Sequence, residues 1–169
     1  SHVFERMGGH FTAFSRGCTV YYAEGIEQVP SNLVETKPTV VLSVPRLYEK
    51  MHTRIIEGLK EAPVIRQKIF WWSLMVGKEY SRLKIDGSSI NIFLNIKHKL
   101  ANKLVFSKVK EKLGGRLRFF VSGGAPLSKE IGEFFSAAGI TILEGYVLTE
   151  TSPVLTSNSP KHIRYGSVG

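Results

Sequence analysis

The chain reads EGYVLTETSP at residues 144–153, directly after the apolar and β-branched run ITIL at 140–143. Such a run predicts a buried strand, and the residues from Glu144 onward are expected to form the loop at its carboxyl end. Ligands of open α/β sheets bind at such loops. The loop carries an aromatic ring at Tyr146, a hydroxyl at Thr149 and a carboxylate at Glu150. These groups can stack on a base, contact a phosphate and hold Mg²⁺, so they predict a nucleotide site.

A second loop of this kind lies upstream, where SGGAPL occupies residues 122–127 between the expected strand 117–121 and a helix beginning at Ser128. Its glycines lack a Cβ, so their backbone amides can approach a nucleotide closely. Either motif alone is weak evidence, because a Gly-Gly turn before a helix is usually only a turn. The two strand–loop units together predict the two walls of one nucleotide site.

The preceding residues indicate an α/β fold with a parallel sheet. Helical spacing of apolar residues predicts a helix over 2–16, and CTVYY predicts a strand over 18–22 that begins with a buried Cys18. A helix over 30–37, a strand over 39–43 and a helix starting at Pro45 follow. This β-α-β-α order predicts parallel strands joined by right-handed crossovers.

Residues 63–115 show no strand pattern and predict an antiparallel helical insertion with a turn at 86–89. Each of its two helices carries an apolar row, formed by Ile65, Ile69, Trp72, Val76, Tyr80 and Leu83 and by Ile92, Ile96, Leu100 and Leu104. The segment 84–118 holds nine Lys or Arg against two acidic residues, whereas the whole chain has a net charge of +9. Such a basic segment favours phosphates or an anionic membrane surface as neighbours, and a solvated helix face is an equal alternative.

Composition excludes several other classes of protein. One cysteine, Cys18, cannot form an internal disulfide, which agrees with a reducing compartment. The five histidines show no metal-ligand spacing, and no apolar run is long enough to span a membrane. The residues from Ser1 onward do not have the pattern of a signal peptide. We therefore expect a cytoplasmic protein, with peripheral membrane contact through 84–118 as an option.

The two loop motifs resemble those of the adenylate-forming, AMP-binding superfamily, and within it the long-chain fatty acid–CoA ligases. SHVFER at 1–6, VPRLYEK at 44–50 and RYGSVG at 164–169 resemble further segments of that subgroup. The resemblance covers essentially the whole chain. It implies that 1–169 is an internal fragment of the large N-terminal domain, with 63–115 inserted in it and with both flanking parts of the enzyme missing.

The resemblance implies a reaction in which a fatty acid and ATP form an acyl-adenylate, from which CoA displaces AMP. Glu150 would hold Mg²⁺, Thr149 would contact phosphate or carboxylate, and Tyr146 would stack on adenine. His2 would lie near the reacting carboxyl and the acyl tunnel. The base and the acyl head would be lined by Gly123, Gly124, Ala125, Pro126, Glu144 and Gly145.

Val147 departs from the family pattern, which usually has glycine at this position. Valine tolerates a positive φ badly, so either the backbone is ordinary there or strain is stored. The branched side chain is expected to narrow the acyl tunnel and to favour shorter or straighter chains.

The family's phosphate-binding loop, ribose-binding aspartate and catalytic lysine are not found in this sequence, so the fragment is expected to be inactive by itself. An alternative function is a membrane-surface or lipid-binding module that uses the basic helices without catalysis. A nucleic-acid partner is not expected, because no aromatic residues alternate with the lysines on a strand.

Overall fold

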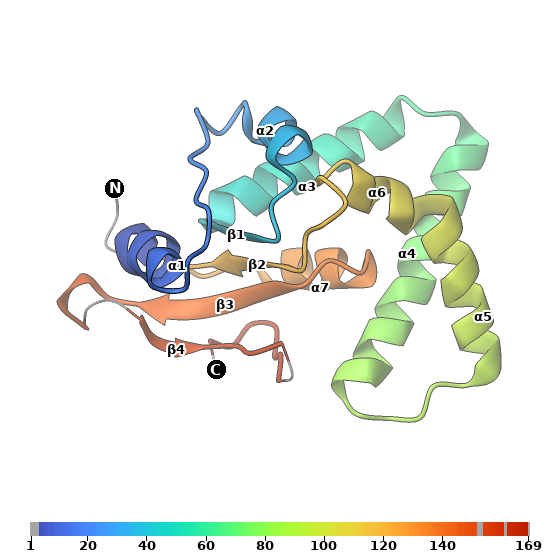
Figure 1. Ribbon diagram of the computed structural model, residues 1–169. Coiled ribbons are helices and arrows are strands. Elements are labelled where there is room, and N and C mark those ends of the chain that lie inside the picture. The colour runs from blue at the N-terminus through green and yellow to red at the C-terminus, as the bar shows by residue number, and fades with distance from the viewer. Residues whose placement is uncertain (1–3, 152–153, 161, 169) are drawn as a thin grey trace.

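The sheet at the centre of the molecule has the strand order β1-β2-β3-β4. In the computed structural model, which describes residues 4–151, 154–160 and 162–168, its strands are β1 (Val40–Ser43), β2 (Phe119–Ser122), β3 (Ile142–Val147) and β4 (Val154–Ser157). β1, β2 and β3 are parallel, and β4 runs antiparallel to β3 (Figure 1). The predicted α/β class with a parallel sheet is confirmed.

Helices pack on both faces of this sheet. On one face, Tyr48 is fully buried against Phe120, and its hydroxyl donates a hydrogen bond of 2.8 Å to the Val121 carbonyl. On the other face, Gly8 lies against Leu42, where an added Cβ would meet the leucine at 3.0 Å. The helices are η1 (Glu5–Phe11), α1 (Thr12–Ser15), α2 (Val29–Thr36), α3 (Pro45–Lys60) and α7 (Lys129–Ala137).

A helical hairpin projects from the sheet between β1 and β2 in the sequence. It consists of α4 (Val64–Ile85), α5 (Ile92–Ala101), η2 (Asn102–Phe106) and α6 (Ser107–Glu111). α4 packs on α7, and α5 runs back along α4 after a turn in which Gly87 has a φ of 67° (Figure 1). The strand-free helical segment and its turn were therefore predicted correctly. Within the described residues, none of the helices combines the length and apolarity needed to cross a membrane.

The predicted strand over 18–22 is wrong. These residues are irregular, Cys18 is exposed, and Tyr21 and Tyr22 are 64% and 61% exposed. The prediction was based on β-branched and aromatic residues, but a strand also needs a hydrogen-bonded neighbour. In the described part of the chain, β1 pairs with β2 only, and residues 18–22 pair with neither.

The apolar row of the second hairpin helix exists, but it does not face the core. Ile92 is 69% and Ile96 59% exposed, whereas Leu94 and Ala101 on the opposite side are buried. Trp72 packs against the core, while Trp71 is 46% exposed. Helical periodicity identifies a row of side chains but does not say what lies against it.

Candidate active site

The two predicted loops lie side by side at one edge of the sheet. Ser122, the last residue of β2, is in register with Glu144 of β3, and the Gly123 amide donates to the Ser43 carbonyl at 3.2 Å. β1 and β2 end together at this edge, since Ser43 is in register with Ser122, whereas β3 continues past Glu144 to Val147. The first loop therefore lies beside the middle of β3, and a ligand shared with the residues after Glu144 stays a prediction from the motif order.

The glycine pair of the first loop meets two different requirements. Gly123 is buried against the Phe4 ring, where an added Cβ would lie 2.9 Å from the nearest ring carbon. Gly124 has a φ of 87°, a conformation that side chains other than glycine rarely adopt. Ala125 and Pro126 follow as exposed residues. The loop is thus shaped by packing and backbone conformation, and its exposed middle is available for contact.

Glu144 is 5% exposed and joins two segments of the site. Its carboxylate accepts hydrogen bonds from the backbone amides of Leu127 and Gly166. Burial raises the pKa of Glu144, and the two amide hydrogen bonds partly offset that rise. The carboxylate therefore holds the end of the first loop to the segment around Gly166.

Strand β3 continues beyond the predicted boundary, so that Glu144, Gly145, Tyr146 and Val147 are strand residues and not loop residues. β3 is longer than predicted because β4 pairs with these residues. Tyr146 is in register with Thr156, and the register shifts between Tyr146 and Val147. Tyr146 is 45% exposed, as a stacking surface requires. Among the described residues the positive φ of a non-glycine residue occurs only at Lys37, so the backbone of Val147 is ordinary.

Thr149 and Glu150 follow β3 on the short helix η3 (Thr149–Thr151), and both are exposed. Glu150 makes no ion pair with any other described residue, and no cluster of three metal-ligating side chains occurs in that part of the chain. A single carboxylate fits Mg²⁺, which commonly binds one or two carboxylates together with substrate phosphates and water. The donor set of η3 is therefore suited to a nucleotide-borne Mg²⁺ and unsuited to a cation held by protein ligands alone.

His2 lies outside the described residues. Phe4, two positions later in the sequence, is 5% exposed and contacts Gly123. The segment that contains Phe4 thus reaches the first loop.

Two groups that stabilise the site were missed by the sequence interpretation. Asn158 is 5% exposed, its amide donates to the Ser167 carbonyl at 2.8 Å, and its side-chain oxygen accepts from the Arg164 amide at 3.2 Å. Tyr165, which lies against Gly132, hydrogen-bonds to Ser136 of α7. Asparagine commonly bonds to nearby backbone, so its position shortly before RYGSVG was the available signal.

Comparison with known proteins identifies the family. The profile described as AMP-binding enzyme matches residues 1–169, and this chain belongs to that family. The resemblance inferred from the two loop motifs is confirmed.

Several relatives are ligases of long-chain fatty acids. The chain is 35% identical over 169 residues to the long-chain-fatty-acid–CoA ligase FadD15 of Mycobacterium bovis, covering 100% of this chain and 28% of that protein. It is 31% identical over 170 residues to the peroxisomal long chain acyl-CoA synthetase 7 of Arabidopsis thaliana, covering 100% and 23%. The chain therefore spans roughly a quarter of the length of these relatives.

Solved structures share the fold. Apo MatB from Rhodopseudomonas palustris matches with a TM-score of 0.54 and 21% identity, covering 99% of this chain and 23% of that one. A benzoate CoA ligase from Burkholderia xenovorans LB400 matches with a TM-score of 0.51 and 23% identity, covering 93% and 22%.

Proposed function

We propose that this chain is the central part of a long-chain fatty acid–CoA ligase. A fatty acid carboxylate oxygen attacks the α-phosphorus of ATP, so that a C–O–P linkage forms and the bond to pyrophosphate breaks. The thiol of CoA then attacks the acyl carbon, a thioester forms and AMP leaves. The long-chain ligases among the relatives and the match to the AMP-binding family support this assignment.

The observation that supports the proposal is the register of Ser122 with Glu144, which brings the start of the first loop beside β3. In this arrangement Tyr146 stacks on adenine while Gly123, Gly124, Ala125, Pro126, Glu144 and Gly145 border the base and the acyl head. Thr149 contacts phosphate or carboxylate oxygens. His2 serves the reacting carboxyl, and the contact of Phe4 with Gly123 supports a position of that segment beside the loop.

Glu150 is the residue proposed to hold Mg²⁺. Bringing a carboxylate to a triphosphate builds up negative charge, and bound Mg²⁺ supplies the positive charge that offsets it. Thr149 and Glu150 are adjacent, exposed residues of η3, so the hydroxyl and the carboxylate can both act on the same phosphate group.

Val147 is proposed to tune the acyl-chain preference. Its backbone is ordinary, so a valine is accommodated without a left-handed conformation. We expect Val147→Gly in the full-length enzyme to shift activity toward longer or more bent chains. A chain-length profile identical to that of the native enzyme would refute this role.

We further propose a cytoplasmic enzyme in which residues 63–115 form a helical insertion of the AMP-binding domain. β1 and β2 are adjacent and parallel, and a crossover between such strands needs only one helix, which α3 provides. The helices α4, α5 and α6 are not needed for this crossover and therefore form the insertion. Its basic segment, 84–118, is available for peripheral membrane contact.

The test is adenylate formation by the full-length enzyme, followed as pyrophosphate release with a long-chain fatty acid. We expect Glu150→Gln to lower kcat about 100-fold and to raise the Mg²⁺ concentration needed for half-maximal rate. Glu111→Gln, an exposed carboxylate at the end of α6, is the matched control and should leave both unchanged. Native rates in Glu150→Gln would overturn the assignment of Glu150.

The alternative function, a lipid-binding module without catalysis, makes a different prediction. Such a module would bind fatty acid equally well with and without ATP, and Tyr146→Ala would have no effect on nucleotide binding. Calorimetric titration of the full-length protein with a stable acyl-adenylate mimic separates the two. The ligase requires binding that weakens in Tyr146→Ala.

A further inference from the structure

Tyr165 attaches the segment after β4 to helix α7. Its ring lies against Gly132, where an added Cβ would come within 2.6 Å of Cδ1 and 3.2 Å of Cε1 of the tyrosine. Its hydroxyl is hydrogen-bonded to Ser136, which lies one turn further along α7 on the same face as Gly132. The ring and the hydroxyl together therefore fix Tyr165 at one place on the helix, and the missing side chain of Gly132 makes room for the ring.

The next residue, Gly166, connects this contact to the site. Its backbone amide donates a hydrogen bond to the Glu144 carboxylate. Successive Cα atoms are about 3.8 Å apart, so the position of Tyr165 on α7 determines where the Gly166 amide lies. Glu144 accepts its second hydrogen bond from the Leu127 amide, at the end of the first loop. The contacts therefore run from α7 through Tyr165, Gly166 and Glu144 to the first loop.

Asn158 has a different role in the same segment. Its side chain bonds to the Ser167 carbonyl and to the Arg164 amide, so both partners lie in the segment itself. These bonds fix the shape of the turn but do not attach it to α7. Tyr165 supplies that attachment, so the loss of its contacts shifts a turn that keeps its own hydrogen bonds.

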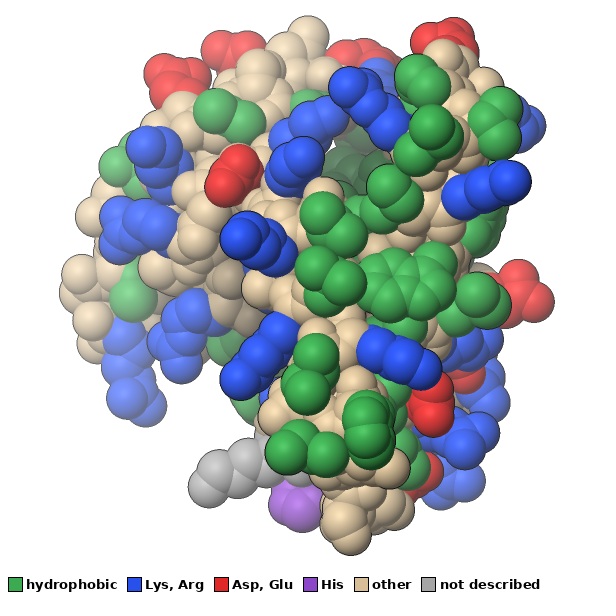
Figure 2. All heavy atoms as spheres, turned by 90° about the vertical axis from the view of Figure 1, so that its right-hand side faces the viewer, with side chains coloured by type: hydrophobic (Ala, Val, Ile, Leu, Met, Phe, Trp, Pro, Cys, Tyr) green, Lys and Arg blue, Asp and Glu red, His purple; other side chains and the backbone are tan. Residues whose placement is uncertain are grey.

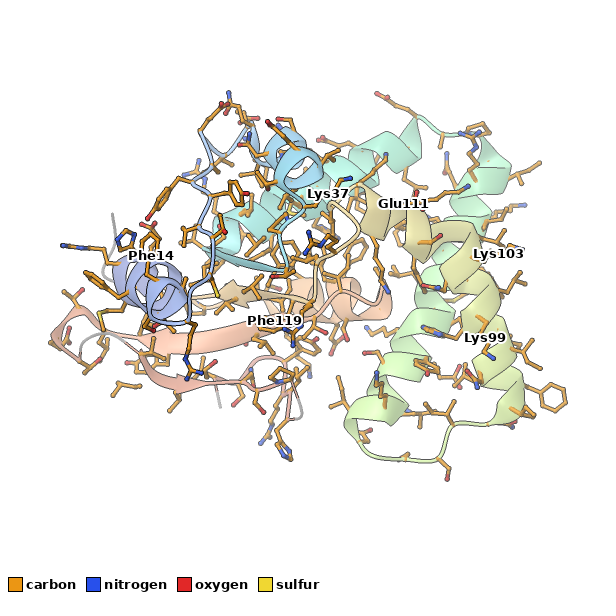
Figure 3. The ribbon with its side chains drawn as sticks, viewed as in Figure 1. Phe14, Lys37, Lys99, Lys103, Glu111 and Phe119 are labelled. Carbon is orange, nitrogen blue, oxygen red and sulfur yellow. The ribbon has the colours of Figure 1, made fainter. Side chains whose placement is uncertain are left out.

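The exposed surface of the hairpin lies apart from these contacts. Figure 2 shows that surface, on which apolar side chains form a band with lysine and arginine on both sides. Lys99 and Lys103, labelled in Figure 3, lie on α5 and η2, away from α7. On its inner side α4 contributes Ser81, which hydrogen-bonds to Ser136. Ser81 and Lys99 therefore provide two control positions, one beside the partner of Tyr165 and one remote from it.

We propose that Tyr165 is a positioning residue for nucleotide binding, because its contacts with α7 place the Gly166 amide and, through Glu144, the first loop. This inference rests on the proposed function, in which that loop borders the adenine base. The loop contacts the base both before and during the reaction, and the loss of such uniform binding raises KM without lowering kcat. Displacement of Tyr165 should therefore raise the KM for ATP and leave kcat near its native value.

The first test displaces the ring without altering it. Gly132→Ala places a methyl group where the ring lies, so in the full-length enzyme we expect an about tenfold higher KM for ATP and a kcat within about twofold of native. Both constants are measured as pyrophosphate release with a long-chain fatty acid. Gly58→Ala makes the same change in α3, where an added Cβ has no other atom within 4 Å, and should leave both constants unchanged. In Tyr165→Ala the additional change Gly132→Ala should have no further effect, because the ring that it displaces is absent.

The second test removes single side-chain groups. Tyr165→Phe keeps the ring and loses the bond to Ser136, so the KM for ATP should rise about fivefold. Tyr165→Ala loses the ring as well, and the rise should be roughly 30-fold. Ser81→Ala removes the other partner of Ser136 but leaves the Tyr165 bond in place, and Lys99→Gln changes the remote hairpin surface. Both of these controls should keep the KM for ATP within about twofold of native.

A double-mutant cycle tests whether Tyr165 acts through Glu144. In Glu144→Gln, where the acceptor of the Gly166 amide is already altered, Tyr165→Phe should raise the KM for ATP less than about twofold. Additive effects would overturn the path through Glu144. A native KM in both Gly132→Ala and Tyr165→Ala would overturn the positioning role, and a fall of kcat with an unchanged KM would overturn it in favour of a general loss of structure.

Hydrogen exchange separates this proposal from the proposed function. The peptide that contains Leu127 should exchange about tenfold faster in Tyr165→Ala than in the native enzyme, whether or not the enzyme forms adenylate. Faster exchange in an enzyme without ligase activity would overturn the proposed function and retain the role of Tyr165 in placing the loop. Native exchange at Leu127 would overturn that role whatever the activity.

Discussion

Gly77 lies where the hairpin packs tightly on the sheet-covering helix α7. A Cβ added at this position of α4 would lie 2.0 Å from the Ala137 carbonyl oxygen and 2.9 Å from the Phe106 ring. At Gly58 in α3, a Cβ added in the same way would have no other atom within 4 Å. The two glycines therefore provide a matched pair in which Gly→Ala changes the same atoms in opposite surroundings.

The magnitudes follow from helix propensity and overlap. In a helix interior alanine is more stable than glycine by about 1 kcal/mol, so Gly58→Ala should stabilise by up to that amount. At Gly77 the obstacle is a backbone oxygen, which cannot rotate away as a side chain does. α4 must move about 1 Å from α7, and overpacking of this kind costs up to about 3 kcal/mol. The net loss at Gly77 is therefore about 2 kcal/mol.

Hydrogen exchange of the full-length enzyme, read by mass spectrometry on peptides from α4 and α7, measures this loss locally. A loss of about 2 kcal/mol corresponds to roughly 30-fold faster exchange of these peptides. Gly58→Ala should leave them unchanged and slow exchange in α3. Native protection of α4 and α7 in Gly77→Ala would refute the close packing of the hairpin on α7.

Three further predictions concern polar groups. Asn158→Ala removes the side-chain hydrogen bonds to Ser167 and Arg164, so we expect local stability to fall by about 2–3 kcal/mol. Faster hydrogen exchange in the C-terminal segment measures this loss, and Asn95→Ala, at an exposed asparagine, is the control. Glu144→Gln replaces one acceptor oxygen by a donor, and exchange of its amide partners should quicken about tenfold. Burial, then Lys110 and Lys84, lower the pKa of His98, so hairpin stability should be complete above pH 6.5 and decline as pH falls below it. His98→Gln should abolish that decline in exchange protection between pH 7.5 and 5.5, after correction for intrinsic rates.

The central sheet was predictable because three of its strands are short apolar runs bounded by strong signals. The strand expected over 39–43 and those expected over 117–121 and 140–143 all occur within one to four residues of their predicted ends. Pro45 begins α3, and Gly139 ends the helical turn after α7 with a φ of 72°. Proline and glycine fix local backbone angles whatever the rest of the fold does, so these boundaries depend little on tertiary context.

The sequence-based predictions fail where the structure of a segment depends on which strand or helix lies beside it. Residues 18–22 have strand-forming side chains but are not paired to β1 or β2, and β3 is lengthened to Val147 by pairing with β4, which was not predicted. In α5 the bulky row is on the outside, whereas the side that packs on α4 combines Leu94 with Ala101, whose small side chain permits close approach. Size complementarity between helices, more than the number of apolar residues, selects the packed side.

The same distinction separates two kinds of residue inside the EGYVLTETSP motif, which a sequence comparison treats alike. Glu144 is buried, and its carboxylate is already engaged by the amides of Leu127 and Gly166. Tyr146, Thr149 and Glu150, farther along the same motif, are exposed. A buried acceptor with two donors stabilises the shape of the site, because moving it to a ligand would leave two amides without a partner. Contact with nucleotide is therefore expected from the exposed members, while Glu144 acts through the position of the loop that it holds.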